Sequence, residues 1–128
     1  MLGVRKTATI AQSLTPAART ASANGTGVDL AGYERALVVV ESGTITDGTH
    51  TIEVQESADN STFTAVADTD LEGTEPAIAA ANDDTVWTIG YVGTKRYVRV
   101  AVTVAGATTG GVYGAQVVRL GPSRKQPH

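Results

Sequence analysis

The 128-residue chain has no cysteine, few aromatic residues and no long apolar run. The lack of cysteine excludes a disulfide framework and thiolate chemistry. Aromatic residues make up 5% of the chain, with one tryptophan and one phenylalanine, so the core has to be built from aliphatic residues. No segment approaches the roughly 20 apolar residues that a membrane-spanning helix needs, and we expect no membrane partner. The first 28 residues also lack the apolar run of a signal peptide, so we expect the protein to stay in the cell that makes it.

The residues that are abundant favour β-structure. Valine and threonine fit a pleated surface, and the 14 glycines mark many tight corners. Short strand patterns separated by turn residues such as Asp47-Gly48 predict an all-β fold, an antiparallel β-sandwich. The clearest strand spans residues 96–104, where alternation predicts one buried face. That face is formed by four valines: Val98, Val100, Val102 and Val104.

Two further segments have distinct patterns. Residues 36–41 are a continuous apolar run, which we interpret as a strand buried on both faces. Residues 67–84 form a predicted acidic loop with one helical turn at residues 77–81, and the possibility that this loop binds a cation stays open. The pattern from Asp68 to Gly73 departs from a calcium loop because Glu72 precedes the glycine and Ala79 occupies the twelfth position.

Composition divides the chain into three parts. Residues 1–28 are rich in Ala, Ser, Thr and Gly and have no burial pattern of their own, so we predict an extended N-terminal arm that is ordered only against another chain. Residues 29–121 form the predicted β-sandwich domain, and residues 122–128 form a basic C-terminal tail.

Charges are sorted along the sequence. All 13 acidic residues lie between Asp29 and Asp84, a stretch that holds one base, Arg35, whereas the other bases flank it. Opposed fields on one domain favour ordered contacts with a charged partner or with copies of the chain itself. The alternative is that folding mixes the charges again. Few bases on an acidic protein give weak phosphate affinity, so we expect no nucleic-acid partner.

Catalytic patterns are not evident in the sequence. His50 has no second histidine or cysteine with which to form a transition-metal site, and we predict a surface or turn role for it. His128 is the last residue, and no G-x-S-x-G nucleophile pattern occurs. We therefore expect no enzymatic activity, no cofactor and no metal site.

Seven segments between Leu30 and Leu120 form a set of scaffold motifs: LAGY at 30–33, ALVVV at 36–40, GTITDGTHT at 43–51, VQES at 54–57, STF at 61–63, IGYVGTKRYVRV at 89–100 and GVYGA at 111–115. Through them, most of the chain resembles a family of small virion structural proteins encoded by tailed bacteriophages and prophages. The resemblance implies a virion component. It leaves head decoration, neck and tail open.

The expected function is head decoration. We expect the chain to assemble in the bacterial host cytoplasm and to bind the major capsid protein of the shell, as well as copies of itself as a homo-oligomer. We expect the N-terminal arm to add as a strand to the edge of a neighbouring sheet. Contacts between opposite charges would set the register of the protein on the shell. The candidate partner-binding residues are Arg5, Lys6, Thr7, Thr9, Ile10, Lys95 and Arg96. The alternatives are a neck or tail component, or a carbohydrate- or receptor-binding module on a fibre, which would need exposed aromatic side chains.

Overall fold

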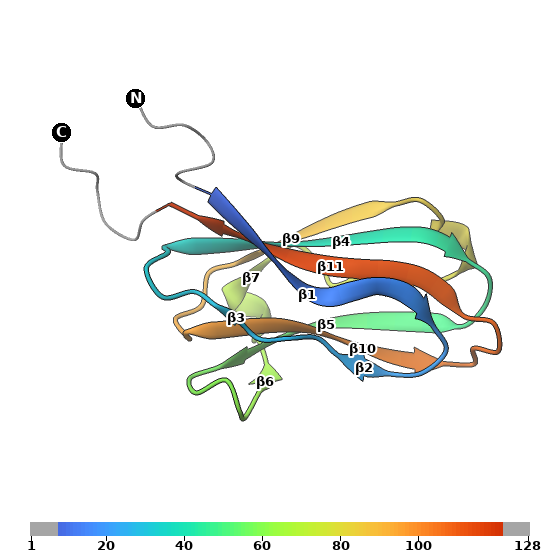
Figure 1. Cartoon of the computed structure of the whole chain (residues 1–128), viewed down its shortest axis with the longest axis horizontal. Coiled ribbons are helices and arrows are strands. Elements are labelled where there is room, and N and C mark those ends of the chain that lie inside the picture. The colour runs from blue at the N-terminus through green and yellow to red at the C-terminus, as the bar shows by residue number, and fades with distance from the viewer. Residues whose placement is uncertain (1–7, 122–128) are drawn as a thin grey trace.

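The computed structural model describes residues 8–121, which form two antiparallel sheets packed face to face (Figure 1). The first sheet has the order β1 (Ala8–Arg19), β11 (Gly111–Leu120), β4 (Arg35–Ile45), β9 (Val86–Tyr91) and β7 (Leu71–Glu72). The second has the order β2 (Ala23–Asn24), β10 (Tyr97–Ala105), β5 (Thr49–Ser57) and β6 (Thr64–Ala65), with β3 (Val28–Asp29) also paired to β10 and β8 (Ala77–Ile78) to β5. These sheets confirm the predicted all-β sandwich.

Strand alternation builds the core between the sheets. Val98 and Val100 of β10 have no exposed surface and Val102 has 3%, which confirms the predicted register. Val104, at the end of the valine row, is half-buried and packs against the core. Aliphatic side chains from both sheets complete the core: Val38, Val40, Ile52, Val54, Ile89 and Val117.

The predicted arm is wrong for its described residues. Ala8–Arg19 is β1, which pairs along its length with β11 of the same chain, and β2 and β3 continue on the second sheet. The strands within residues 8–28 therefore belong to the sandwich, ahead of its predicted start at residue 29. Leu14 of β1 is 2% exposed, and it is the large apolar side chain that anchors β1 in the core. Residues 1–7 and the predicted basic tail at 122–128 lie outside the described residues.

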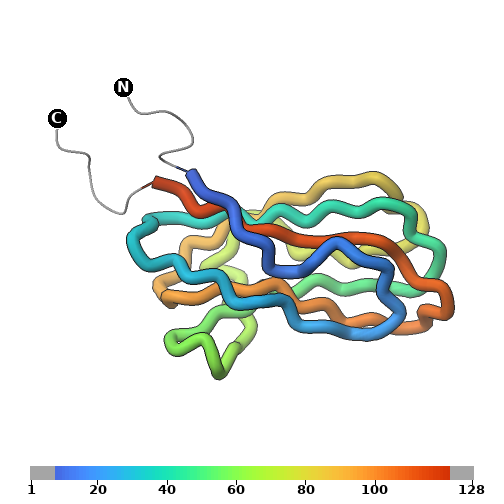
Figure 2. Tube along the Cα trace, viewed as in Figure 1, coloured from blue at the N-terminus to red at the C-terminus, as the bar shows by residue number. Residues whose placement is uncertain are grey.

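One long side of the sandwich is closed where the chain passes from β1 to β2 (Figure 2). The Ser13 hydroxyl donates to the carbonyl of Thr26 and accepts from the N–H of Val100, at 2.8 and 2.9 Å. Gly25 donates its N–H to the Val100 carbonyl, and a Cβ at this glycine would lie 2.5 Å from the carbonyl oxygen of Ser13. The lack of a side chain at Gly25 thus lets the two sheets meet along this side.

The opposite side is closed by residues 67–84. This segment contains two short 3-10 turns, η1 (Asp68–Asp70) and η2 (Ala80–Asn82), and reaches both sheets through β7 on β9 and β8 on β5. The predicted helical turn at 77–81 is therefore replaced by a strand followed by η2. Ile78 is fully buried, and its side chain holds the acidic segment against the rest of the protein.

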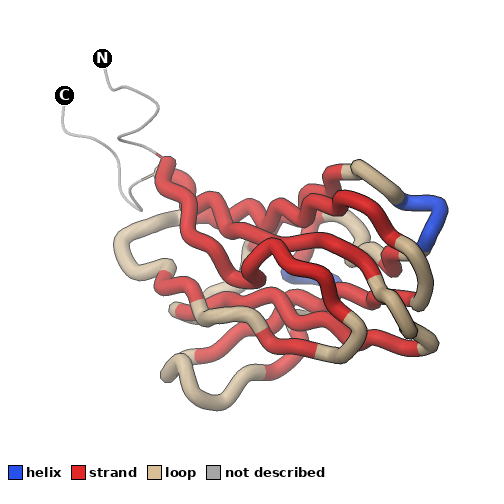
Figure 3. The backbone as a smooth tube through the Cα atoms, turned by 45° about the vertical axis from the view of Figure 1, so that its right-hand side comes forward, coloured by secondary structure: helices blue, strands red, loops and turns tan. Residues whose placement is uncertain are grey.

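The strands run between two ends where the loops gather (Figure 3). We call one the hairpin end, formed by the β4–β5 turn at 46–48 and the β10–β11 turn at 106–110. The other is the clamp end, formed by the start of β1, the end of β11 and the loops at 30–34 and 92–96. Within residues 8–121, no helix is long and apolar enough to cross a membrane.

Candidate partner-binding site

The clamp end gathers bases from segments that are far apart in the sequence. Arg35 opens β4, Lys95 and Arg96 precede β10, and Arg119 lies near the end of β11. Because neighbouring strands are antiparallel, the starts of β4 and β10 and the end of β11 meet at the same end of the sandwich. The fold therefore keeps part of the charge sorting that the sequence shows.

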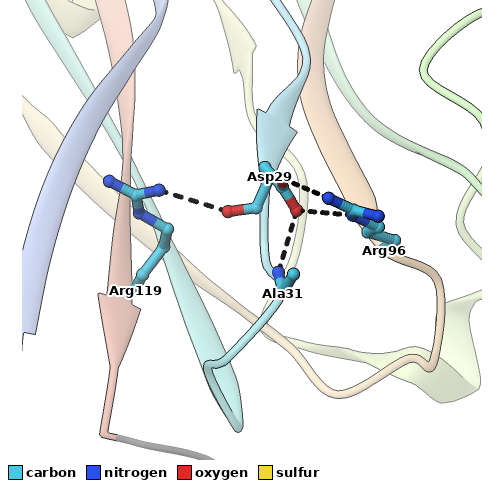
Figure 4. A network of polar contacts seen from close by, with 4 residues as sticks. All are labelled: Asp29, Ala31, Arg96 and Arg119. Atoms are coloured by element: carbon cyan, nitrogen blue, oxygen red, sulfur yellow. Dashed lines mark hydrogen bonds and ion pairs between the residues drawn. The ribbon is translucent and has the colours of Figure 1, made fainter.

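Asp29 joins two of these bases, Arg96 and Arg119 (Figure 4). The Arg96 guanidinium donates Nε to Oδ1 of Asp29 at 2.9 Å and Nη2 to Oδ2 at 2.8 Å. The N–H of Ala31 donates to the same carboxylate at 2.9 Å, and Nη1 of Arg119 donates to the Asp29 carbonyl oxygen at 3.2 Å. The Arg96 hydrogen bonds, with that from Ala31, lower the pKa of Asp29 to about 2. We call this arrangement the Asp29 clamp.

The clamp continues through Tyr33 to β1. The Arg119 guanidinium lies 5.0 Å from the centre of the Tyr33 ring, at cation–π distance. The Thr9 hydroxyl donates to the Tyr33 oxygen at 3.0 Å. One connected network thus joins Thr9 of β1 to Arg96 before β10 and fixes the relative positions of the segments around it.

Lys95 lies beside the network with its side chain exposed. Its backbone N–H donates to the Tyr91 hydroxyl at 3.1 Å, and that hydroxyl donates to Glu56 Oε1 at 2.7 Å. Burial, together with this bond to Glu56, raises the pKa of Tyr91 well above its usual value. The Tyr91 hydroxyl therefore anchors the backbone of the 92–96 loop, while the Lys95 ammonium group faces solvent.

A hollow of about 510 Å³ opens at the clamp end. Residues of the 30–35 and 92–96 segments line it, and Arg35, Lys95 and Arg96 contribute the cations. Glu34 is the carboxylate in the lining. A hollow of this size with exposed cations on a fixed backbone can accept acidic side chains of a protein partner.

The structure brings together only some of the predicted partner-binding residues. Thr9 and Arg96 belong to one network, and Lys95 lies next to it. Ile10 is 61% exposed on the outer face of the first sheet and takes no part in the network. Arg5, Lys6 and Thr7 lie outside the described residues.

The prediction for His50 is wrong. This residue is fully buried at the hairpin end, where its ring meets Tyr113 edge-on at 5.0 Å between ring centres. Nε2 lies 3.0 Å from the carbonyl oxygen of Asp47, and Nδ1 lies 2.7 Å from the Tyr113 hydroxyl. A carbonyl only accepts, so Nε2 carries a hydrogen, and in the tautomer with its hydrogen on Nε2 the Nδ1 atom accepts from Tyr113.

The Asp47 carboxylate closes the hairpin end. It accepts the backbone N–H groups of Thr108, Thr109 and Gly110, the last at 2.6 Å, and these bonds hold its pKa below the usual range. Arg19 donates to the Tyr113 carbonyl at 2.8 Å and ties the end of β1 to β11. The polar groups of this end are therefore satisfied by the chain itself.

A sequence signal for the buried histidine did exist. His50 has the same parity in its strand as Ile52 and Val54, which alternation places inward. Its partner Tyr113 is 63 residues away, so the hydrogen bond that makes burial tolerable is not visible in the sequence. Among residues 8–121, no group of three His, Cys, Asp or Glu side chains is placed to hold a metal ion.

The fold and the site define an antiparallel β-sandwich with a fixed cationic end. No family model matches the chain, and no curated protein matches it. Among solved structures, the crystal structure of SPBc2 prophage-derived protein YomS is similar, with 21% sequence identity and a TM-score of 0.45. The alignment covers 87% of this chain and 91% of that one. A similarity at this level assigns neither family nor function, so function is argued from the site.

Proposed function

We propose that this protein is a structural component of a tailed-phage particle, a head decoration protein bound to the shell of major capsid protein through its clamp end. The family resemblance of its scaffold motifs supports the class. The observation that carries the attachment is the exposed Lys95 ammonium group, held on an anchored loop beside a cation-lined hollow.

The Asp29 clamp prepares the surface for binding. Arg96 is 55% exposed and Asp29 is 42% exposed, so their ion pair adds little to folding stability. The ion pair instead holds the Arg96 guanidinium in one position before a partner binds. Binding then costs less side-chain entropy than it would if the guanidinium were free to move. Charge of this kind also raises the association rate and sets the register of the contact.

Strand addition by residues 8–19 is not part of this attachment. They form β1, the edge strand of the first sheet, and one side of it already pairs with β11 of the same chain, so they are not a free arm that leaves the domain to join a neighbour's sheet. The proposed contact is therefore made by side chains at the clamp end. An exposed ion pair contributes only about 0–1 kcal/mol, so the cations of the clamp end have to act together in each bound copy.

The test is binding to particles purified from a deletion strain that lacks this protein. Lys95→Glu reverses one exposed cation without touching the clamp, whereas Arg96→Glu would place a carboxylate beside Asp29 and disturb the fold. We expect Lys95→Glu to weaken binding several-fold at about 0.05 M NaCl and the difference to vanish near 1 M, where the Debye length falls to about 3 Å.

The matched control uses a change of one charge unit at each of two places. Lys95→Gln removes one positive charge at the clamp end, and Thr103→Glu adds one negative charge at an exposed position on the outer face of the second sheet. We expect the first to weaken binding and the second to leave it unchanged. Equal effects of the two variants, or saturation by Lys95→Glu at the wild-type concentration, would contradict attachment through the clamp end.

A further inference from the structure

The outer face of the first sheet carries exposed apolar side chains, with polar ones such as Gln12, Thr88 and Gln116 among them. Four large apolar side chains are more than one-third exposed in residues 8–121: Ile10 at 61%, Val86 at 56%, Val92 at 44% and Val112 at 40%. Ile10, Val86 and Val112 occupy outward positions of β1, β9 and β11, and Val92 continues the outward row of β9 by one step. Half-buried aliphatic side chains lie between them: Leu37, Val39 and Val118.

Charged side chains on this face lie at the two ends of β4 and on β7, where Glu72 pairs with Gly90 of β9. Side chains alternate along a strand, so the outward row of β4 reads Arg35, Leu37, Val39 and Glu41, with both charged residues exposed. Arg35 and Glu41 are about 20 Å apart at roughly 3.4 Å per residue. The row therefore has opposite charges at its ends and aliphatic groups between them.

We propose that this face binds a second copy of the chain, forming a two-fold symmetric dimer with the two first sheets packed face to face. A two-fold axis that crosses β4 at Val38, in the plane of the contact and perpendicular to the strand, reverses the strand direction in the second copy. Arg35 of each copy then faces Glu41 of the other, and Leu37 faces Val39. Along β4 the face is complementary to itself in both charge and polarity. On β11 and β1 the same axis places Gln116 opposite Val118 and Gln12 opposite Ile10.

The same rotation matches the neighbouring strands. Val38 is in register with Val117 of β11 and Ile89 of β9, so the axis crosses those strands there. Val86 of each copy then meets Val92 of the other, which covers two of the exposed valines. On β11, Gly114 of one copy meets Leu120 of the second.

A hollow of about 370 Å³ lies at Gly114. Pro16, Val39 and Val112 form the apolar part of its lining, and Glu41 and Asp84 are the carboxylates in it. A Cβ at Gly114 would lie 2.8 Å from the Pro16 backbone. Leu120 is half-buried and points outward from the same strand. In the dimer, Leu120 of the second copy fills the hollow, which gives the two faces matching shapes.

The size of the face is adequate. The strands β1, β11, β4 and β9, spaced about 4.8 Å apart with about ten residues of about 3.4 Å each, cover roughly 650 Å². A standard stable interface buries about 800 Å² per partner. Side-chain relief adds to the flat estimate, so the face can support a dimer without any other contact.

The first test is a charge swap, read by sedimentation velocity of the purified full chain. Arg35→Glu and Glu41→Arg each place like charges opposite one another at two points of the dimer, and we expect each to weaken dimerisation at least tenfold. The double variant Arg35→Glu/Glu41→Arg restores both pairs and should dimerise as the wild type does. Failure of the double variant to recover, with circular dichroism showing an intact fold, would overturn the proposed axis.

The second test addresses the apolar centre. Val39→Asp puts a carboxylate in the middle of the interface, and Thr51→Asp puts one at an exposed position on the outer face of the second sheet. We expect the first variant to be monomeric and the second to remain dimeric. A wild type that stays monomeric at millimolar concentration would overturn the dimer, and if Val39→Asp then also lost particle binding, the face would belong to the shell protein instead.

Discussion

The two ends of the sandwich use the same kinds of side chain for different purposes. At each end an aspartate accepts at least one backbone N–H group, a tyrosine hydroxyl makes a hydrogen bond, and an arginine joins two strands. At the hairpin end the tyrosine is buried with His50, and its partners lie within the chain. At the clamp end the aspartate and arginine are 42% and 55% exposed. Burial therefore decides whether such a network stabilises the fold or serves a partner.

The free energies expected for buried and exposed polar groups support this difference between the two ends. Leaving a buried polar group without its partner costs about 1–3 kcal/mol, whereas an exposed ion pair contributes about 0–1 kcal/mol. The hairpin end should therefore be sensitive to loss of a single hydrogen bond. The clamp end should tolerate similar changes in folding and respond to them in binding.

The largest expected effect comes from Tyr113→Phe, which leaves Nδ1 of the buried His50 without its donor. We expect the free energy of unfolding to fall by about 1–3 kcal/mol, as measured by urea denaturation. Tyr33→Phe is the matched change at the clamp end, where water can replace the hydroxyl that pairs with Thr9, and it should cost under about 1 kcal/mol. Equal losses in the two variants would remove the distinction between the ends.

A second pair of variants compares the two aspartates. Asp47→Ala removes the acceptor of three backbone N–H groups in the β10–β11 turn, and it should lower the melting temperature. Asp29→Ala removes the clamp and should lower it less, because the groups it frees are already open to water. Thermal unfolding followed by circular dichroism measures both. A larger drop for Asp29→Ala would reverse the assignment of the two ends.

The pH dependence of the clamp follows from the sign of its pKa shift. Folding lowers the pKa of Asp29 from 3.8 to about 2, so its contribution to stability is present above 3.8 and is lost as pH falls through about 2. The small difference in unfolding free energy between wild type and Asp29→Asn should therefore be constant near neutral pH and disappear at about pH 2. A difference that persists unchanged at about pH 2 would show that the carboxylate is not the group responsible.

The smallest expected effect on folding is that of Lys95→Glu. Its ammonium group is exposed, and only its backbone N–H takes part in the anchoring of the loop. We expect unfolding to change by no more than about 0.5 kcal/mol, the usual range for a surface substitution. A marked loss of stability would mean that Lys95 serves the fold, and its effect on particle binding would then need another explanation.

The sequence predicted the parts of the fold in which local pattern and burial agree. The alternating valines of β10 gave the correct register because that strand is central and regular. β1 was predicted as part of an extended arm outside the sandwich because register shifts at Gln12/Leu14 and Leu14/Ala17 interrupt its alternation and its partner strand lies at the other end of the chain. The run at 36–41 was interpreted as buried on both faces, but Leu37 and Val39 are half-exposed on the outer face of the first sheet.

The candidate site was predictable in part. Sorting of charge drew attention to Lys95 and Arg96, and the structure places them at the clamp end. The role of Asp29 was hidden because its partners Arg96 and Arg119 are 67 and 90 residues away. The pairing of β3 with β10 and the packing of this sheet against the one that contains β11 bring the three together.

Copy number per purified particle tests the central proposal most directly. Virions from a host that carries the gene can be separated on a gel, and the band of this protein quantified against the major capsid protein. Decoration of the shell predicts a fixed ratio to the capsid protein that corresponds to hundreds of copies per particle. A ratio that corresponds to about six or twelve copies would place the protein in the neck, and absence from the particle would contradict a structural role in the virion.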